Sequence, residues 1–165
     1  MSAFIDVELR TRIADLFTRY AHAIDNDELE SWPGFFIAEA QYLITTRDNH
    51  LKGLPVGIMY CDGQGMMHDR VTAVRQAIVY APHVYRHIFS MPLITVLEDG
   101  AAYAADTNFH ILRTNADGAM VTYACGRCLD EIVMRGGGSG GEMLFRKRTV
   151  VLDSSRIDTL LVIPL

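Results

Sequence analysis

The second half of the chain is dominated by segments in which apolar and polar residues alternate, with turn signals between them. Alternation with a period of two is the pattern of a half-buried β-strand. Two of the breaks, Asp99-Gly100 and the stretch 115–118 (Asn-Ala-Asp-Gly), are typical of tight hairpins. The predicted strands are Tyr85–Leu97 with a bend at Pro92, Ala101–Thr114, Ala119–Met134, Met143–Asp153 and Ile157–Ile163.

Helical patterns precede these strands. Apolar side chains recur every three or four positions over residues 6–26, which predicts an amphipathic helix. A short second helix with Leu29, Trp32, Phe35 and Phe36 is expected next, capped by Asp27 or Ser31. A strand over Gln41–Arg47, an irregular stretch over 48–66 and a third helix over 67–79 complete this half.

Helices followed by antiparallel strands indicate an α+β fold with the helices packed on one face of a sheet. Long strands interrupted by glycine and proline favour a strongly curved, mainly antiparallel sheet that forms a cone around the helices. The 165 residues suit one domain, which we expect to span 1–165.

The amino-acid composition argues against several classes of protein. Apolar residues make up 50% of the chain and charged residues 21%, which excludes intrinsic disorder and leaves enough apolar surface for a subunit interface. Fifteen basic against twenty acidic residues give a net charge of −5, which argues against nucleic-acid binding. We expect no secretion signal and no membrane span, and therefore a soluble cytoplasmic protein.

Two patterns resemble metal or redox motifs but are incomplete. Cys125 and Cys128 have C-x-x-C spacing inside a predicted strand, where positions three apart point to opposite faces. His83 and His87 share a strand face, yet no third ligand is evident. We therefore expect no metal ligands in this chain.

One polar strand face allows a catalytic alternative. Asp106, Asn108 and His110 lie on one side of their strand, and Asp106 with His110 could act as an acid–base pair if the cone is hollow and polar. The chain would then be a stand-alone dehydratase or isomerase, or a small-ligand binding protein. Trp32 and the aromatic residues after it favour a filled interior instead.

Two further segments suggest burial or loop structure. Residues 160–165 end on apolar side chains, so we expect them to dock in a core or against a partner. The glycine-rich stretch 136–141 is predicted to be a hairpin loop with no catalytic role.

Methionines 59, 66 and 67 suit either core packing or an interface.

The order and spacing of several stretches resemble the small (β) subunits of Rieske-type aromatic-ring-hydroxylating dioxygenases. These stretches are Gly57-Ile58-Met59-Tyr60-Cys61-Asp62, Met67-His68-Asp69-Arg70-Val71, Tyr85-Arg86-His87-Ile88, the residues Arg146, Arg148, Val150, Leu152 and Asp153, Asp158-Thr159-Leu160, and Ile163-Pro164-Leu165. The region around Asp48-Asn49-His50 and the block Met59–Arg70 are most similar to the branch that acts on benzoate, anthranilate or terephthalate. The glycine stretch 136–141 departs from the pattern.

The resemblance implies an NTF2-like cone and a non-catalytic structural subunit. It implies a larger catalytic α subunit that holds a Rieske [2Fe–2S] cluster and a mononuclear non-haem iron, in an α3β3 heterohexamer with a trimer of small subunits. Electrons from NADH would reach the α subunit through a reductase, and O₂ would be used to cis-dihydroxylate an aromatic carboxylate. No cofactor is expected in this chain.

Interface candidates follow from the same stretches. They are Tyr60, Asp62, Asp69, Arg70, Tyr85, Arg86 and His87. Charges in apolar surroundings need partners, so Asp62 or Asp69 is expected to pair with Arg70 or Arg86, within the subunit or across a contact.

Overall fold

The computed structural model of the chain describes residues 5–77, 81–97, 101–136, 140–157 and 161–165. Its elements follow in order: α1 (Val7–Asp25), the 3₁₀ helix η1 (Leu29–Phe35), β1 (Phe36–Thr46), α2 (Arg47–Leu51), β2 (Met59–Asp62), α3 (Gln64–Gln76), β3 (His83–Phe89), β4 (Leu93–Leu97), β5 (Ala102–Asn115), β6 (Met120–Arg135) and β7 (Glu142–Leu152). Among the described residues, no helix is both long and apolar enough to cross a membrane.

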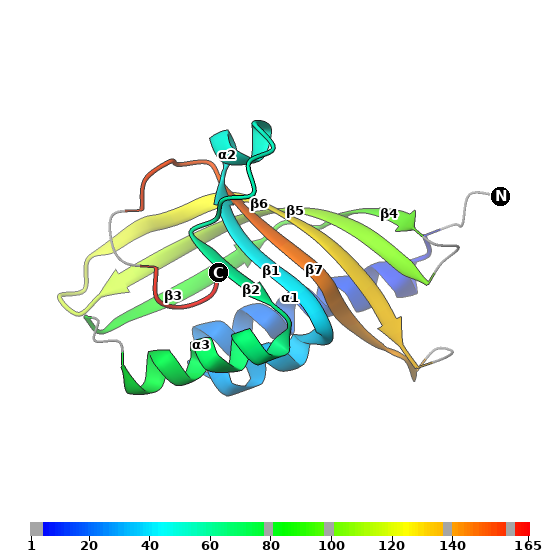
Figure 1. Cartoon of the computed structure of the whole chain (residues 1–165), viewed down its shortest axis with the longest axis horizontal. Helices are drawn as coiled ribbons and strands as arrows, with labels where there is room; N and C mark the ends of the chain where they lie inside the picture. Colours follow the sequence, from blue (N-terminus) through cyan, green and yellow to red (C-terminus); the bar gives the residue numbers. More distant parts are fainter. Residues whose placement is uncertain (1–4, 78–80, 98–100, 137–139, 158–160) are drawn as a thin grey trace.

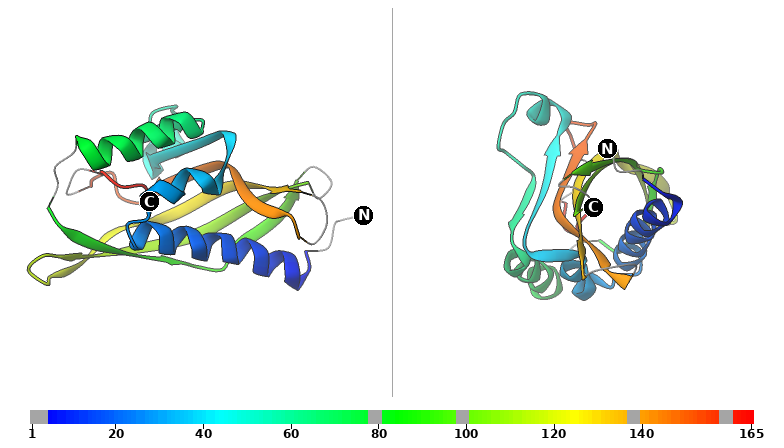
Figure 2. Two further views of the ribbon diagram at one scale, coloured as in Figure 1. Left: turned by 90° about the horizontal axis from the view of Figure 1, so that it is seen from below. Right: turned by 90° about the vertical axis from the view of Figure 1, so that its right-hand side faces the viewer.

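The strands form one mixed, mostly antiparallel sheet in the order β2-β1-β7-β6-β5-β3, with β4 also paired to β5. The pair of β1 and β7 is parallel and the other pairs are antiparallel. The sheet curls around a central axis, and α1 lies along its open side (Figure 2). Helix α2 projects from the end of the sheet away from α1 and α3 (Figure 1). The expected α+β architecture is confirmed.

The strand predicted over residues 85–97 is two strands. Both β3 and β4 pair with the same edge of β5, β3 with its second half and β4 with its first. Pro92 lies between them, and proline has no N–H to donate to a sheet ladder. The break therefore replaces the bend that was predicted at this proline.

The hairpin predictions have two outcomes. The turn at 115–118 is confirmed, because Asn115 N–H donates to the carbonyl of Ala119 and Gly118 N–H to that of Asn115. Asp99 and Gly100 lie outside the described residues. The stretch 136–141 connects the antiparallel strands β6 and β7, as expected of a hairpin loop, although 137–139 are not described.

Boundaries in the first half differ from the predictions. The first strand begins at Phe36, five residues before the predicted start, and Arg47 already belongs to α2. The stretch 48–66, predicted to be irregular, contains most of α2, all of β2 and the start of α3. These elements are short, and β2 has only four residues, which is too few for a periodic signal.

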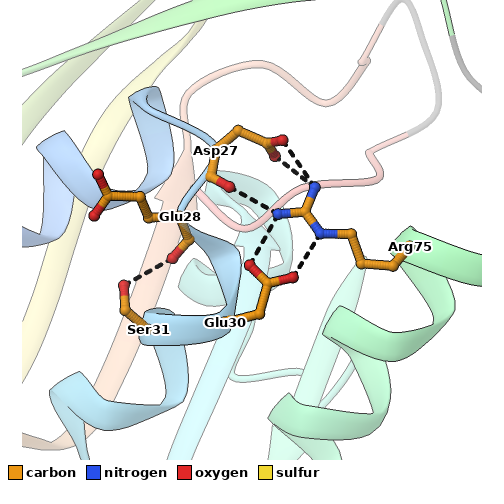
Figure 3. Close-up of polar contacts among 5 residues, drawn as sticks. All are labelled: Asp27, Glu28, Glu30, Ser31 and Arg75. Atoms are coloured by element: carbon orange, nitrogen blue, oxygen red, sulfur yellow. Dashed lines mark hydrogen bonds and ion pairs between the residues drawn. The ribbon is translucent and has the colours of Figure 1, made fainter.

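The predicted second helix is a 3₁₀ helix without a side-chain cap. Glu28 occupies the N-cap position, so the expected capping by Asp27 or Ser31 is wrong. Ser31 instead donates its hydroxyl hydrogen to the Glu28 carbonyl, and Arg75 of α3 bonds to Asp27 and Glu30 (Figure 3). Asp27 has a φ of 60°, so the chain turns sharply between α1 and η1.

The last described residues are buried but do not form a strand, so the strand predicted over 157–163 is absent from the parts that are described. Tyr20 and Tyr42 both donate from their hydroxyls to the Leu165 carbonyl, at 2.8 and 3.0 Å. Docking in the core, expected from the apolar ending, is confirmed for Leu161–Leu165.

Candidate subunit interface and cone interior

Strand β3 carries three interface candidates, and they point to opposite faces of the sheet. Tyr85 and His87 point into the cone and are buried, whereas Arg86 points outward and is exposed. The outward-facing neighbours Val84 and Ile88 are each 51% exposed. Of the three candidates, Arg86 is therefore the one that a partner can reach, at the centre of an apolar patch.

This outer patch continues across the sheet. Val84 pairs with Thr114, and Thr114 pairs with Met120, whose side chain is 73% exposed. We call Val84, Arg86, Ile88 and Met120 the β3 patch. An arginine surrounded by exposed apolar side chains has the composition of a protein–protein contact.

A second exposed apolar region runs along the opposite edge of the sheet. Its large apolar side chains are all at least 44% exposed: Leu51, Leu54, Val56, Ile58, Tyr60 and Met66. The candidate Tyr60 lies on β2 between the buried residues Met59 and Cys61, so it faces outward by strand alternation. Asp62 at the end of β2 is exposed as well.

The two candidates on α3 have different environments. Asp69 is exposed, whereas Arg70 is half-buried and donates to the carbonyls of Leu161 and Val162 at 2.8 and 3.0 Å. Arg70 therefore fastens the last residues to α3. In the described residues no ion pair joins Asp62 or Asp69 to Arg70 or Arg86, so the expected pairs do not form within the subunit.

The acid–base alternative is not supported by geometry. Tyr103, Ala105 and the other odd-numbered residues of β5 face inward, so Asp106 and His110 lie on the outer face. Asp106 forms an ion pair with Arg127, and His110 bonds to the Thr122 hydroxyl at 3.1 Å.

Strand β6 places Arg127, and not Gly126 or Cys128, on the same face as Asp106. The register between β5 and β6 shifts after Ile111. Cys128 is buried and Cys125 exposed, in agreement with opposite faces for the two cysteines.

The interior of the cone contains an ion pair that the sequence analysis missed. Arg148 of β7 donates to Asp130 of β6 at 3.1 Å, and both side chains are fully buried. Arg148 also donates to the Cys128 sulfur at 3.2 Å. Strand alternation could have indicated this burial. Arg148 lies two positions before the buried Val150 on β7, and Asp130 lies two positions after the buried Cys128 on β6, so each shares the inward face of its neighbour.

Aromatic rings enclose the Arg148 guanidinium. Its central carbon lies 4.4 Å from the ring centroid of Tyr20, 4.7 Å from that of Phe145, 5.2 Å from that of Phe17 and 5.4 Å from that of Phe89. These distances allow cation–π attraction. Burial raises the pKa of Tyr20 to about 12, so its hydroxyl stays neutral and bonded.

The same burial acts on the acidic groups beside Arg148. Desolvation raises the pKa of Asp130 to about 7, although Arg148 opposes the shift. It also raises the pKa of the Cys128 thiol to about 12, which keeps that sulfur protonated and unreactive. This cluster is therefore a closed part of the core.

Aromatic side chains also fill the region beside η1. Trp32 and Phe36 are almost completely buried, Phe35 packs against the core, and Trp32 donates from its indole nitrogen to the Tyr20 hydroxyl at 3.1 Å. The interior is thus packed with side chains here, as predicted from these aromatic residues.

A second inward-facing pair joins β3 to α1. His87 Nδ1 lies 2.6 Å from the Asp25 carboxylate, which also accepts the His87 backbone N–H at 3.0 Å. His83 bonds through Nδ1 to the Ala81 carbonyl instead. Within the described residues, no three His, Cys, Asp or Glu side chains are grouped as metal ligands.

Comparisons with known proteins agree on one family. The model of the SnoaL-like domain matches residues 6–149. The chain is 37% identical to terephthalate 1,2-dioxygenase terminal oxygenase component subunit beta 1 of Comamonas sp., over 93% of this chain and 97% of that one. The chain belongs to the small-subunit family of aromatic-ring-hydroxylating dioxygenases.

Two more members of the small-subunit family support this placement. The anthranilate 1,2-dioxygenase small subunit of Burkholderia cepacia is 34% identical, over 97% of this chain and 96% of that one. A crystal structure assigned as the beta subunit of an aromatic-ring-hydroxylating dioxygenase from Novosphingobium aromaticivorans superposes with a TM-score of 0.84 at 34% identity, covering 94% and 96% of the two chains. The resemblance noted in the sequence, and the NTF2-like cone that it implied, are confirmed.

Proposed function

We propose that this chain, as one domain over residues 1–165, is the non-catalytic small subunit of a cytoplasmic oxygenase that cis-dihydroxylates an aromatic carboxylate. The observation that carries the proposal is the end-to-end similarity to the small subunits of terephthalate and anthranilate dioxygenases. The substrate class comes from those relatives, and O₂ with NADH-derived electrons are the co-reactants that the reaction needs.

The partner in this proposal is a larger α subunit, in an α3β3 assembly that contains a trimer of small subunits. The Rieske cluster and the mononuclear iron would belong to the α subunit, and the reductase would deliver electrons to it. The described residues of this chain offer no set of ligands that fits either group.

Two exposed surfaces support an assembly role. The β3 patch has Arg86 at its centre, and the opposite edge presents Tyr60 and Asp62. We assign Arg86 to a contact with an α subunit or with another small subunit, where its charge meets a carboxylate of the partner. Asp69 and Arg70, on helix α3, are further interface candidates in this proposal. Tyr85 and His87, which point into the cone from β3, would support the interface from the inside.

Purification of the tagged chain from its native cells tests the proposal. We expect a larger protein to copurify in stoichiometric amount, with iron and the visible absorbance of an iron–sulfur cluster in the eluate. A clean eluate that contains this chain alone, without iron, would overturn the assignment.

A variant then locates the contact. Arg86→Ala should lower the yield of the complex, whereas Arg10→Ala, which removes an exposed arginine from α1, should leave it unchanged. Equal yields of complex from both variants and the unmodified chain would remove Arg86 from the interface and leave the subunit assignment intact.

A further inference from the structure

A cavity of about 450 Å³ lies on the outer side of the cone, between α2 and the strands β5, β6 and β7. Asn108, Arg127 and Val151 form a row across its floor, because Arg127 pairs with Asn108 on β5 and with Val151 on β7. Helix α2, which projects from the sheet (Figure 1), supplies Arg47 and Leu51 to the wall. The volume is within the range of ligand pockets.

The cavity presents hydrogen-bond donors that the subunit itself does not use. The Arg47 guanidinium lies 3.9 Å from the Asp153 carboxylate, which is too far for a hydrogen bond, and the Arg47 side chain is 65% exposed. Arg127 binds Asp106 through Nε and Nη2, which leaves Nη1 for a ligand. The Asn108 amide is exposed beside it. A ligand that carries acceptor oxygens can therefore reach several donors at once.

The charges around the cavity favour a ligand with a single negative charge. Asp106 already neutralises Arg127, so Arg47 is the cation whose carboxylate partner is distant. A guanidinium binds a carboxylate through two parallel N–H groups. A dianion would be repelled by Asp153, which lines the same cavity. His50, also in the lining, is exposed and can add a further hydrogen bond.

The apolar part of the lining is aliphatic. Leu51 is 72% exposed, Leu129 is half-buried, and Val151 lies on the floor between them and the sheet. Phe109 borders the cavity as well, but it faces inward and its ring packs in the core. The surface offered to the body of a ligand is therefore made of leucine and valine side chains, which suits a short aliphatic chain.

We propose that this cavity binds a small aliphatic carboxylate. The carboxylate accepts hydrogen bonds from Arg47 and from Nη1 of Arg127. The aliphatic chain packs against Leu51, Leu129 and Val151. This chain alone forms the site, so the proposal goes beyond the assembly role and does not depend on a larger subunit.

A cysteine inside the cavity provides the test. Cys125 lines the cavity and is exposed, whereas Cys61 and Cys128 are buried. Iodoacetamide should therefore alkylate Cys125 first, and a bound ligand should slow that reaction. The full chain is titrated with hexanoate, and alkylation of each cysteine is followed by mass spectrometry. We expect saturable protection of Cys125.

Two other probes define what the site recognises. Hexanamide has the same chain without the charge, so the concentration that gives half-protection should be about fivefold higher than for hexanoate. Inorganic phosphate, which carries more charge and no aliphatic chain, should also protect less well than hexanoate.

Variants then test the two parts of the site separately. Arg47→Gln changes an exposed side chain and should raise the half-protecting concentration of hexanoate about fivefold. Leu51→Ser removes apolar contact and should raise it about threefold. Arg10→Gln, on α1, is the matched control and should leave it unchanged. Each protein is compared with itself without hexanoate, so a change in the intrinsic reactivity of Cys125 cancels.

Three results would overturn the proposal: no saturable protection of Cys125, protection by hexanamide or phosphate at the same concentration as by hexanoate, or an Arg47→Gln variant that behaves as Arg10→Gln does. None of these depends on whether a larger subunit copurifies with the chain. The test and the oxygenase assignment can therefore fail separately.

Discussion

Arg148 and Arg75 both bind carboxylates, but they do so in opposite surroundings. Arg148 is buried in the cone and donates to one oxygen of Asp130 and to the sulfur of Cys128. Arg75 on α3 is 32% exposed and forms five hydrogen bonds with Asp27 and Glu30 (Figure 3). The surface arginine thus has more bonds than the buried one.

The carboxyl pKa values show which environment dominates. Hydrogen bonds from Arg75 lower the pKa of Glu30 to about 2, because they favour the charged carboxylate and its exposed position costs it little hydration. Desolvation raises the pKa of Asp130 to about 7, although an arginine lies beside it. Asp130 Oδ1 and Arg148 Nε also have no hydrogen-bond partner. The contribution of an arginine to stability therefore depends on burial more than on its number of hydrogen bonds.

The largest predicted effect follows from removing the buried cation. Arg148→Met keeps most of the side-chain volume but leaves Asp130 in the core without its partner. We expect the free energy of unfolding to fall by about 3 kcal/mol or more, measured by urea denaturation at neutral pH.

A double variant is the control for that prediction. Adding Asp130→Leu to Arg148→Met removes the stranded carboxyl group and should recover most of the loss, since apolar replacements of buried ion pairs are often neutral. A single variant as stable as the unmodified chain would show that the pair contributes nothing.

The second prediction concerns pH. Folded Asp130 holds its proton up to about pH 7, whereas in the unfolded chain the same carboxyl loses it near the ordinary value of 3.8. The unfolded chain therefore binds fewer protons over this interval, and the free energy of unfolding should fall as the pH rises through it. The fall amounts to roughly 1.4 kcal/mol per unit of pKa difference.

Asp130→Asn should abolish that fall, because asparagine does not titrate. Urea denaturation of both proteins between about pH 4 and pH 8 measures the difference between their curves. Parallel curves would contradict a raised pKa at Asp130.

Tyr20 supports the third prediction, of intermediate size. Its hydroxyl donates to the Leu165 carbonyl and accepts from Trp32. Tyr20→Phe leaves the indole N–H of Trp32 without this acceptor, so we expect a loss of about 1–3 kcal/mol in thermal or urea unfolding. Tyr60→Phe, which changes an exposed tyrosine of β2, is the comparison, and an equal loss there would argue against a specific role for the Tyr20 hydroxyl.

These regions also show how far sequence patterns reach. Helix α1 and the inward face of β5 could be predicted, because their periodicities extend over many residues. The Asp25–His87 pair could not, since its partners are 62 positions apart and only the path of the sheet brings them together. The short strand β2 and the division of β3 from β4 depend on pairing with distant strands, which leaves little local trace.

The ion pair between Arg148 and Asp130 could be predicted only in part. Arg148 follows the inward alternation of β7, yet a charged residue in a strand usually indicates the solvent face. Its burial becomes understandable only with the aromatic rings from α1, β3 and β7 around it. Interface residues such as Arg86 stay predictions, because their roles depend on a second chain.

The smallest predicted effect belongs to the surface arginine. Arg75→Gln removes all of the ion pairs in Figure 3, but exposed pairs contribute little, so we expect a loss of about 1 kcal/mol or less that shrinks further in high salt. Because the pKa of Glu30 is lowered, its contribution is present above its ordinary pKa of 4.5 and is lost as the pH falls toward 2. Arg10→Gln is the matched control. A loss as large as that of Arg148→Met would reverse the comparison, and would mean that the sharp turn at Asp27 depends on Arg75.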